Sequence, residues 1–480
     1  MQIHKVSSKM AIKQVIQYNS SNRYFAGFLQ SMIDESGIVG SLSQSDGSII
    51  LRLEDEDTKA LEEFSTLTSK YLPHSLFLGD VQTINVQTHS TESKLSSPSY
   101  NISVCPKCLE LLTDPSSSEY LNDSLVCNHY SNDSIQDYRD DKYYSPHYSN
   151  GSDILIIDPT TVHKLFMMTQ DEVNALFSIE KPTLKVTIKD ETLKELTGKK
   201  FINIKSPHSI KSNLVALNAR ESDVEYLFFE HSDDLKVVVV QNDITVIRDI
   251  RGVSNKLEEL DSDSTINRFL NISKEAGFEK SSIAANLSTR SGISFLVSND
   301  GVSKKVINFQ EFKAKEVLEL MAQDETKSKL LNNFAKKYPE IMEELSNNDE
   351  YNMFETIATI LELEEKSFES VSDKSFEFHG NGGLKIDTNF DDDGFDYISF
   401  IGSIMSFKLA DTDEHYLAYS IFEALGDMAI STLNQLKKKF KCENFVMMGD
   451  MFENSVLYSR ILSKFELNKP YFSKGFALDD

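Results

Sequence analysis

The sequence predicts an α/β protein of several domains, and three observations support this prediction. The chain has 480 residues, a length typical of about three domains. Short runs rich in β-branched residues alternate with amphipathic stretches as far as Ser455–Lys464, as strands and helices do in mixed folds. Three of the four cysteines lie within one polar stretch, residues 88–150, which separates two parts richer in apolar residues.

The composition excludes several classes of partner. Hydrophobic residues make up 40% of the chain and charged residues 26%, as in a soluble globular protein. The formal net charge of −26 repels phosphate backbones and anionic lipid, and no basic patch compensates for it. We therefore expect neither nucleic-acid nor membrane partners. No apolar segment of a secretory signal follows Met1–Lys5, so a cytoplasmic protein is expected.

The first 87 residues predict a small unit of the ferredoxin-like type, with the order β-α-β-β-α-β. In Tyr24–Ser36 the apolar residues recur at helical spacing, and Gly37 follows as a C-terminal cap. Ser45–Ser48 has the composition of a hairpin turn. The expected elements are Lys13–Gln17, Tyr24–Ser36, Ile38–Val39, Ile49–Leu51, Asp57–Tyr71 and Val81–Val86.

Strand and helix patterns continue to alternate through the rest of the chain. Strands are expected at Ile154–Ile157, Leu184–Ile188, Tyr226–Phe229, Val237–Val240, Ser294–Ser298, Lys305–Phe309 and Phe445–Met448. Helices are expected at Phe312–Met321, Glu355–Leu363, His415–Lys439 and Ser455–Lys464.

The cysteines form the clearest chemical pattern. Cys105 and Cys108 form a CPKC pair, and eighteen residues later Cys127 is followed by His129. Paired thiols in a reducing compartment suit a tetrahedral zinc site better than a disulfide. A second CxxC would place a cysteine where Tyr130 stands, so the fourth ligand is expected to be His129, with His147 as an alternative. A degenerate knuckle that holds no metal is the competing interpretation.

The chain is poor in glycine. It has 19 glycines, about 4% of its residues, against a usual ~7%. Loops that cradle phosphate need glycine because the backbone must approach the ligand closely and adopt positive φ. Few such loops are therefore expected.

Four segments resemble the HypF family, the carbamoyltransferases of [NiFe]-hydrogenase maturation. Cys105–Pro115 reads CPKCLELLTDP and resembles the first zinc motif of that family, CPxCLxELxDP. Met353–Leu361 resembles its LFDAVAxLL helix, and Gly449–Asn454 resembles its GGVFQN loop. Ser282–Leu287 stands where the family has a strand that leads to Asp-Leu-His-Pro.

The resemblance implies a fold for each part of the chain. A HypF begins with an acylphosphatase-like domain, which agrees with the β-α-β-β-α-β unit, and it ends with an ASKHA-type (actin-like) α/β domain. The expected division is an acylphosphatase-like domain at 1–90, a degenerate zinc-knuckle segment at 91–150, an α/β linker or YrdC remnant at 151–222, and an ASKHA-like carbamoyltransferase-like domain at 223–480.

The N-terminal domain departs from the family at its catalytic loop. An acylphosphatase cradles the acyl phosphate in a VQGVGFR loop, with the arginine on the phosphate oxygens. The corresponding run, Ile16–Arg23, lacks both glycines, and Arg23 is the one candidate catalytic residue that remains. Ser43 stands where the family places a water-positioning asparagine. Acylphosphatase activity is expected to be absent.

The transferase domain departs from the family as well. The HHxAH and NDGG motifs that bind a metal there are missing from this sequence. The nucleotide-binding SAGR run becomes Asp349–Asn352, in which Tyr351 replaces the glycine and Asn352 the arginine. A bulky side chain and an acidic pair should block and repel a phosphate. We therefore do not expect ATP as a cofactor.

The sequence thus predicts an accessory protein of [NiFe]-hydrogenase maturation, HypF-like and without catalysis, that acts through protein–protein contacts. The resemblance implies partners among the hydrogenase maturation proteins or a hydrogenase subunit. Two alternatives stay open. One is a divergent carbamoyltransferase that uses Arg23, ATP and carbamoyl phosphate. The other is a regulatory module built on the zinc-binding segment.

Overall fold

The computed structural model forms two compact units. It describes residues 10–45, 47–54, 58–87, 102–127, 129, 143–231, 234–241, 243–391, 394–465 and 469–480. The first unit extends to Lys256 and includes Lys474–Leu478 and Asp480, and the second contains Leu257–Ser473 and Asp479. Within the described parts of the chain, no helix combines the length and apolarity needed to cross a bilayer.

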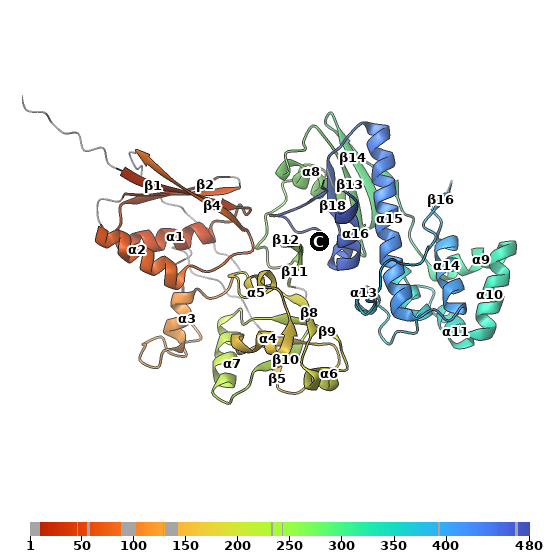
Figure 1. The fold of residues 1–480 in the computed structure, drawn as a ribbon, viewed down its shortest axis with the longest axis horizontal. Coiled ribbons are helices and arrows are strands. Elements are labelled where there is room, and N and C mark those ends of the chain that lie inside the picture. Colours follow the sequence, from red (N-terminus) through yellow and green to blue (C-terminus); the bar gives the residue numbers. More distant parts are fainter. Residues whose placement is uncertain are drawn as a thin grey trace, which may run out of the picture. The chain divides into compact units, whose positions relative to one another are not determined.

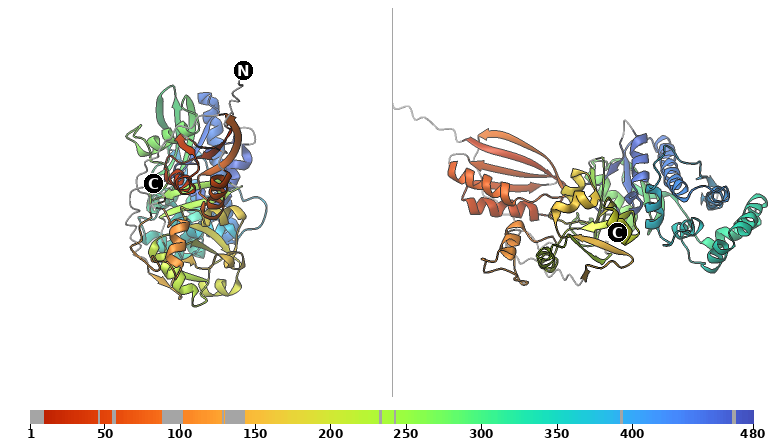
Figure 2. Two further views of the ribbon diagram at one scale, coloured as in Figure 1. Left: turned by 90° about the vertical axis from the view of Figure 1, so that its left-hand side faces the viewer. Right: turned by 60° about the horizontal axis from the view of Figure 1, so that its bottom comes forward.

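The first unit begins with a four-stranded antiparallel sheet of order β2-β3-β1-β4, and two helices pack on one face of it (Figures 1 and 2). Its elements are β1 (Met10–Tyr18), α1 (Tyr24–Ser36), β2 (Gly40–Ser45), β3 (Ser48–Glu54), α2 (Thr58–Tyr71) and β4 (Leu78–Gln87). This order is the expected β-α-β-β-α-β arrangement.

Local sequence accounts for most of these boundaries. Helix α1 spans the predicted residues and ends where Gly37 adopts a φ of 68°, a left-handed conformation that glycine reaches without a steric penalty. The prediction of the first hairpin strand at Ile38–Val39 is wrong, since strand β2 begins at Gly40. That strand reads GSLSQS, and only Leu42 of its apolar side chains marks the buried face.

A six-stranded sheet of order β5-β10-β6-β9-β8-β7 is the second sheet of this unit. Its strands are β5 (Tyr144–Ser145), β6 (Ser152–Ile156), β7 (Phe166–Met167), β8 (Leu184–Ile188), β9 (Phe201–Lys205) and β10 (Tyr226–Glu230). Only β6 and β9 pair in parallel. The associated helices are α4 (Val162–Leu165), α5 (Gln170–Leu176), α6 (Glu191–Thr197) and α7 (Ile210–Arg220), and the ribbon β11 (Leu235–Val240) and β12 (Asp243–Asp249) follows. The expected division at residue 222 stays a prediction.

A buried carboxylate joins the two sheets of the first unit. Glu180, in the segment before β8, is fully buried. Its carboxylate accepts hydrogen bonds from the Tyr24 hydroxyl at 2.8 Å, the Ser75 hydroxyl at 2.6 Å and the Leu76 N–H at 3.0 Å. The guanidinium of Arg251 donates to the Glu180 peptide carbonyl. The second sheet is therefore bonded to the start of α1 and to the turn before β4.

The second unit is built on a five-stranded mixed sheet of order β15-β14-β13-β18-β19. The strands are β13 (Ser281–Ser288), β14 (Gly292–Asn299), β15 (Val302–Asn308), β18 (Phe445–Met448) and β19 (Tyr471–Phe472). The first three are antiparallel, whereas β18 runs parallel to both of its neighbours. Strand β13 is buried along almost its whole length, as expected for the centre of a sheet covered on both faces.

Helices make up the rest of the second unit (Figure 1). They are α8 (Ser264–Glu275), α9 (Ala314–Gln323), α10 (Glu325–Lys337), α11 (Pro339–Asn347), α12 (Met353–Ile360), α13 (Phe368–Phe376), α14 (Tyr397–Leu409), α15 (Glu414–Phe440) and α16 (Ser455–Lys464). A short ribbon of β16 (Phe390–Asp391) and β17 (Gly394–Phe395) lies between α13 and α14. The fold class is thus α/β with several sheets, as predicted.

Gly449 allows a close backbone approach in the second unit. It follows β18 with a φ of 106°, and a Cβ there would lie 2.0 Å from the carbonyl oxygen of Leu287. Since that oxygen belongs to the backbone of β13, a side chain cannot be accommodated by a rotamer change.

Replacing Gly449 should therefore be far more damaging than replacing a glycine that only needs positive φ. Gly449→Ala is expected to destabilise the second unit by about 3 kcal/mol or more, since the backbone must move. Gly292→Ala is the matched control, because Gly292 has a φ of 78° and open space around its Cβ position, and should cost about 1 kcal/mol. Thermal unfolding followed by circular dichroism measures the midpoint of each variant. Equal midpoints for Gly449→Ala and Gly292→Ala would contradict the steric argument.

Removing the Glu180 carboxylate should open the contact between the two sheets of the first unit. Glu180→Ala leaves three donors without an acceptor and should cost about 3 kcal/mol, whereas Glu180→Gln keeps one acceptor and should cost less. Amide hydrogen exchange measures the loss of this contact, and Glu180→Ala should make exchange in α1 and β8 faster. Glu191→Ala, which removes an exposed ion pair with Lys194, should leave exchange unchanged.

Candidate functional site

Three cysteines and one histidine converge in the first unit. Cys105 caps helix α3 (Pro106–Thr113), and its sulfur accepts the N–H of Cys108 at 3.3 Å. Pro106 occupies the first helical turn, where its missing N–H costs nothing. This turn brings both sulfurs of the CPKC pair to one side, where Cys127 and His129 join them.

The geometry of the cluster fits a tetrahedral metal ion. The four ligand atoms all lie within 4.8 Å of one another. His129 Nδ1 lies 3.2 Å from the sulfur of Cys105, 3.6 Å from that of Cys108 and 3.7 Å from that of Cys127. Zinc bound at ~2.3 Å from sulfur and ~2.0 Å from nitrogen places these atoms about 3.5 Å apart. The three sulfur–nitrogen distances therefore agree with those around a tetrahedral metal ion.

The electrostatics of the cluster favour a cation. All three thiols are buried, and burial raises the pKa of Cys105 above its ordinary value. Hydrogen bonds from the Cys105 and Cys108 thiols lower the pKa of Cys127, so one thiolate is stabilised by two neighbouring S–H groups. A bound cation would displace those protons, because thiolates are the species that ligate metals.

The cluster is attached to the first sheet through its helices. The ring of His129 packs edge-on against Phe28 of α1, with 6.2 Å between ring centroids. On α3, Lys107 forms an ion pair with Glu35 of α1. Glu110 accepts the Tyr71 hydroxyl of α2 at 2.6 Å. His147, the alternative ligand, is exposed in the turn after β5 and is not part of the cluster.

The loop between β1 and α1 is closed where an acylphosphatase would cradle phosphate. The N–H of Ser21 donates to the Asn255 side chain at 2.6 Å, and the N–H of Asn22 donates to the Ser20 hydroxyl at 3.1 Å. The Asn22 amide in turn donates to the carbonyl of Val253 at 2.6 Å. Two backbone donors that could face an anion are therefore already engaged within the protein.

Arg23 and Ser43, the two side chains expected to act at this loop, are both exposed. Arg23 is exposed at the first position before α1 and makes no capping hydrogen bond with its side chain. Ser43 is exposed on β2. Its neighbour Gln44, which sequence reasoning missed, donates to the carbonyls of Ser20 and Asn22 at 2.9 and 3.0 Å. Gln44 therefore stabilises the loop from the position next to Ser43, which was compared with the water-positioning asparagine of the acylphosphatases.

In the second unit, the run that replaces SAGR starts a helix. Asn352 caps α12, and its side-chain oxygen accepts the N–H groups of Phe354 and Glu355 at 2.9 and 3.0 Å. Glu355 accepts the N–H of Asn352 in return at 2.7 Å, which completes a capping box. Asp349 pairs with Lys315 at 3.0 Å. The backbone donors of this helix start are thus occupied by the protein itself.

The loop Gly449–Asn454 is also held by internal bonds. Asp450 is buried and accepts the N–H and hydroxyl of Thr289 at 2.7 and 2.6 Å. The amide of Asn454 donates to the hydroxyls of Ser372 and Ser375 on α13 at 2.9 and 3.0 Å. The motif that resembles GGVFQN therefore connects β13, β18 and α13 within this unit.

Two kinds of similarity to known proteins emerge. Protein HydE of Wolinella succinogenes is 23% identical over 344 residues, 64% of this chain and 62% of that protein, so the match spans less than two thirds of the relative. No protein-family model matches the chain.

Crystal structures of HypF share the fold of this chain. Full-length HypF in a phosphate- and nucleotide-bound form aligns with a TM-score of 0.57 at 11% identity, covering 98% of this chain and 96% of that one. HypF from T. kodakarensis aligns with a TM-score of 0.62 at 12% identity and the same coverage. The expected HypF-like architecture is thus confirmed as a fold that extends over nearly the whole chain.

Metal content tests the cluster directly. The purified protein is expected to carry one zinc ion per chain, measured by elemental analysis together with thiol titration before and after chelation. Cys108→Ser, Cys127→Ser and His129→Ala should each lower the zinc content severalfold, since each removes a ligand.

Cys442→Ser provides the control, because Cys442 is a buried thiol of the second unit whose sulfur lies 3.8 Å from the Asn444 carbonyl oxygen. It should leave the zinc content unchanged. A wild-type protein that stays metal-free, with the three cluster thiols still reactive after incubation with zinc, would contradict the assignment.

Proposed function

We propose that the chain is a non-catalytic accessory protein of [NiFe]-hydrogenase maturation that acts through contacts with other proteins. One contrast carries the proposal: the HypF-like fold extends over nearly the whole chain, while the loop that would cradle phosphate is closed by the protein's own hydrogen bonds. A fold kept without its ligand-binding donors suits a protein whose surfaces, rather than its turnover, are used.

The closed loop matters because anion binding depends on available donors. A phosphate at a helix N-terminus is held by backbone N–H groups that have no other partner. At the start of α1, Asn255 and Ser20 accept the N–H groups of Ser21 and Asn22. If a ligand were to use these two N–H groups, their bonds to Asn255 and Ser20 would break, as would the bonds of Gln44 to the loop carbonyls. Each displaced bond costs about 1 kcal/mol, so phosphate binding at this loop is disfavoured.

The Cys/His cluster suits a structural zinc ion. All four positions of a tetrahedral site would be filled by Cys105, Cys108, Cys127 and His129, whereas a catalytic zinc site keeps one position for water or substrate. When bound, the ion would supply a cross-link for a segment with a small core. The residues around it fix the orientation of α3 through ion pairs with α1 and α2.

The partners proposed are other hydrogenase maturation proteins or a hydrogenase subunit. The formal net charge of −26 disfavours nucleic acids and supports an encounter with a basic protein surface. Pull-down of the full chain with candidate maturation proteins and hydrogenase subunits tests this at physiological salt.

Binding and turnover of ATP and carbamoyl phosphate test the proposed loss of catalysis. The full chain, assayed at high concentration beside an authentic HypF, is expected to bind neither compound and to hydrolyse neither above background. The physical reason is the shortage of unoccupied donors at both candidate sites.

Arg23→Ala distinguishes the proposed non-catalytic function from the alternative of a divergent carbamoyltransferase. Under the proposal this substitution changes no rate, because Arg23 is an exposed residue beside a closed loop. Turnover above background that disappears in Arg23→Ala, but not in the exposed-surface variant Lys59→Ala, would establish the carbamoyltransferase alternative instead.

A further inference from the structure

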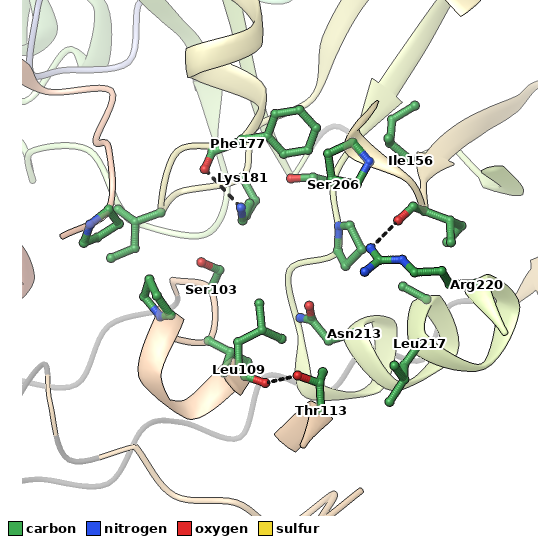
Figure 3. Close-up of a pocket in the computed structure, with 18 residues that line it drawn as sticks. Ser103, Leu109, Thr113, Ile156, Phe177, Lys181, Ser206, Asn213, Leu217 and Arg220 are labelled. Atoms are coloured by element: carbon green, nitrogen blue, oxygen red, sulfur yellow. Dashed lines mark hydrogen bonds between the residues drawn. The ribbon is translucent and has the colours of Figure 1, made fainter. Parts of the chain in front are cut away.

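A cavity of about 350 Å³ opens in the first unit at the carboxyl ends of the parallel strands β6 and β9 (Figure 3). Ile156 and Ile157 line it from the end of β6, and Ser206 lines it from the end of β9. Helices α3 and α7 supply further walls. Proline and aliphatic side chains dominate the lining, and the volume lies in the range of small-molecule sites.

Two cationic side chains line this apolar cavity. The Lys181 amine donates to the carbonyl of Phe177 at 3.1 Å, and the Arg220 guanidinium on α7 donates to the carbonyl of Ile157 at 2.7 Å (Figure 3). Among the described residues, neither has a carboxylate within ion-pair distance. Arg220 is exposed and therefore hydrated, and Asp158 acts on it electrostatically. Lys181 is largely buried, and a buried lysine at an apolar cavity without a carboxylate in contact indicates an anionic ligand.

Lys181 is held there in spite of two costs. Its φ of 48° is left-handed, a conformation that a residue with a Cβ adopts only when the surroundings impose it. Its side chain is largely buried, and burial lowers the pKa of the amine to about 8, although the neighbouring carboxylate of Glu180 opposes this shift. A purely structural role would be met more easily by an apolar side chain.

We infer that this cavity binds a small organic carboxylate with an apolar body, and that the Lys181 ammonium holds the carboxylate. The proline and aliphatic walls contact the body of the ligand, while Arg220 adds positive potential from α7. The bond of Lys181 to Phe177 leaves two of its three donors for the ligand. This site is independent of the proposed accessory function.

A nucleotide does not fit this description. Its triphosphate carries several negative charges and needs a row of backbone donors or a metal ion, whereas this cavity offers two cations and mostly apolar walls. The chemistry favours a monoanion that desolvates easily and has no second charged group.

Benzoate is a suitable probe for the full chain, with titration calorimetry and saturation-transfer NMR as the measurements. One site with a Kd on the order of 0.1–1 mM is expected for a ligand of this size. Benzamide, which has the same shape without the charge, should bind at least tenfold more weakly. Equal binding of benzoate and benzamide, or tighter binding of ATP in competition, would overturn the proposal.

Variants identify the residues that hold the probe. Lys181→Met should weaken benzoate binding at least tenfold and raise the thermal midpoint, because it removes a buried charge without changing the length of the side chain. Arg220→Met should weaken binding to a smaller extent. Lys194→Met, which removes a partly exposed lysine paired with Glu191 outside the cavity, is the control and should change neither quantity. Unchanged benzoate affinity in Lys181→Met would overturn the assignment.

Chemical labelling of the wild-type chain tests the site without any substitution, so the result does not depend on whether the variants fold. In the wild-type chain, an amine-reactive acetylating reagent at pH 8 should modify Lys181 faster than Lys194, since a larger fraction of the Lys181 amine is neutral. Benzoate should slow the labelling of Lys181, followed by peptide mass spectrometry, and benzamide should not. Labelling of Lys181 that benzoate leaves unaffected at saturating concentration would reject the site.

Discussion

The arrangement of the first unit depends on one buried carboxylate. Burying an ionised group is costly, and Glu180 offsets the cost with three donors that all come from the N-terminal sheet domain. Its donor Tyr24 is the first residue of α1, and burial raises the pKa of that hydroxyl well above its ordinary value, so it remains a donor. The start of α1 and the second sheet are thus fixed together, and both the closed loop and the cavity lie next to this junction.

The loop between β1 and α1 is closed by side chains from distant parts of the chain. The side-chain oxygen of Asn255 accepts the N–H of Ser21, and the amide of Gln44 on β2 donates to the carbonyls of Ser20 and Asn22. The fold keeps its connectivity because the backbone groups remain satisfied. In the second unit, the capping box of α12 likewise satisfies backbone N–H groups at the start of that helix.

The sequence predicted those parts that local rules determine. Helix α1 and strand β18 match their predicted bounds, because periodicity, a glycine cap and an aliphatic run are local signals. The structure also brings Cys105, Cys108, Cys127 and His129 together, while their role as metal ligands stays a prediction. Gln44 could not be found this way, because it bonds to Ser20 and Asn22 on a distant loop. The position of Lys181 could not be found either, because the cavity that it lines is formed by segments far apart in the chain. Helix α10 was missed because Phe334 is its only buried residue and its apolar stripe is narrow.

Helix α3 has a consequence that reaches beyond its own segment. Cys105 and Cys108 at its first turn belong to the metal-type cluster, while Pro106, Leu109 and Thr113 line the cavity. Because this helix of eight residues contributes to both sites, any coupling between a bound metal ion and a cavity ligand would be reciprocal and of equal magnitude. Under the two proposals together, metal binding at the cluster would change the affinity of the cavity for its small-molecule ligand.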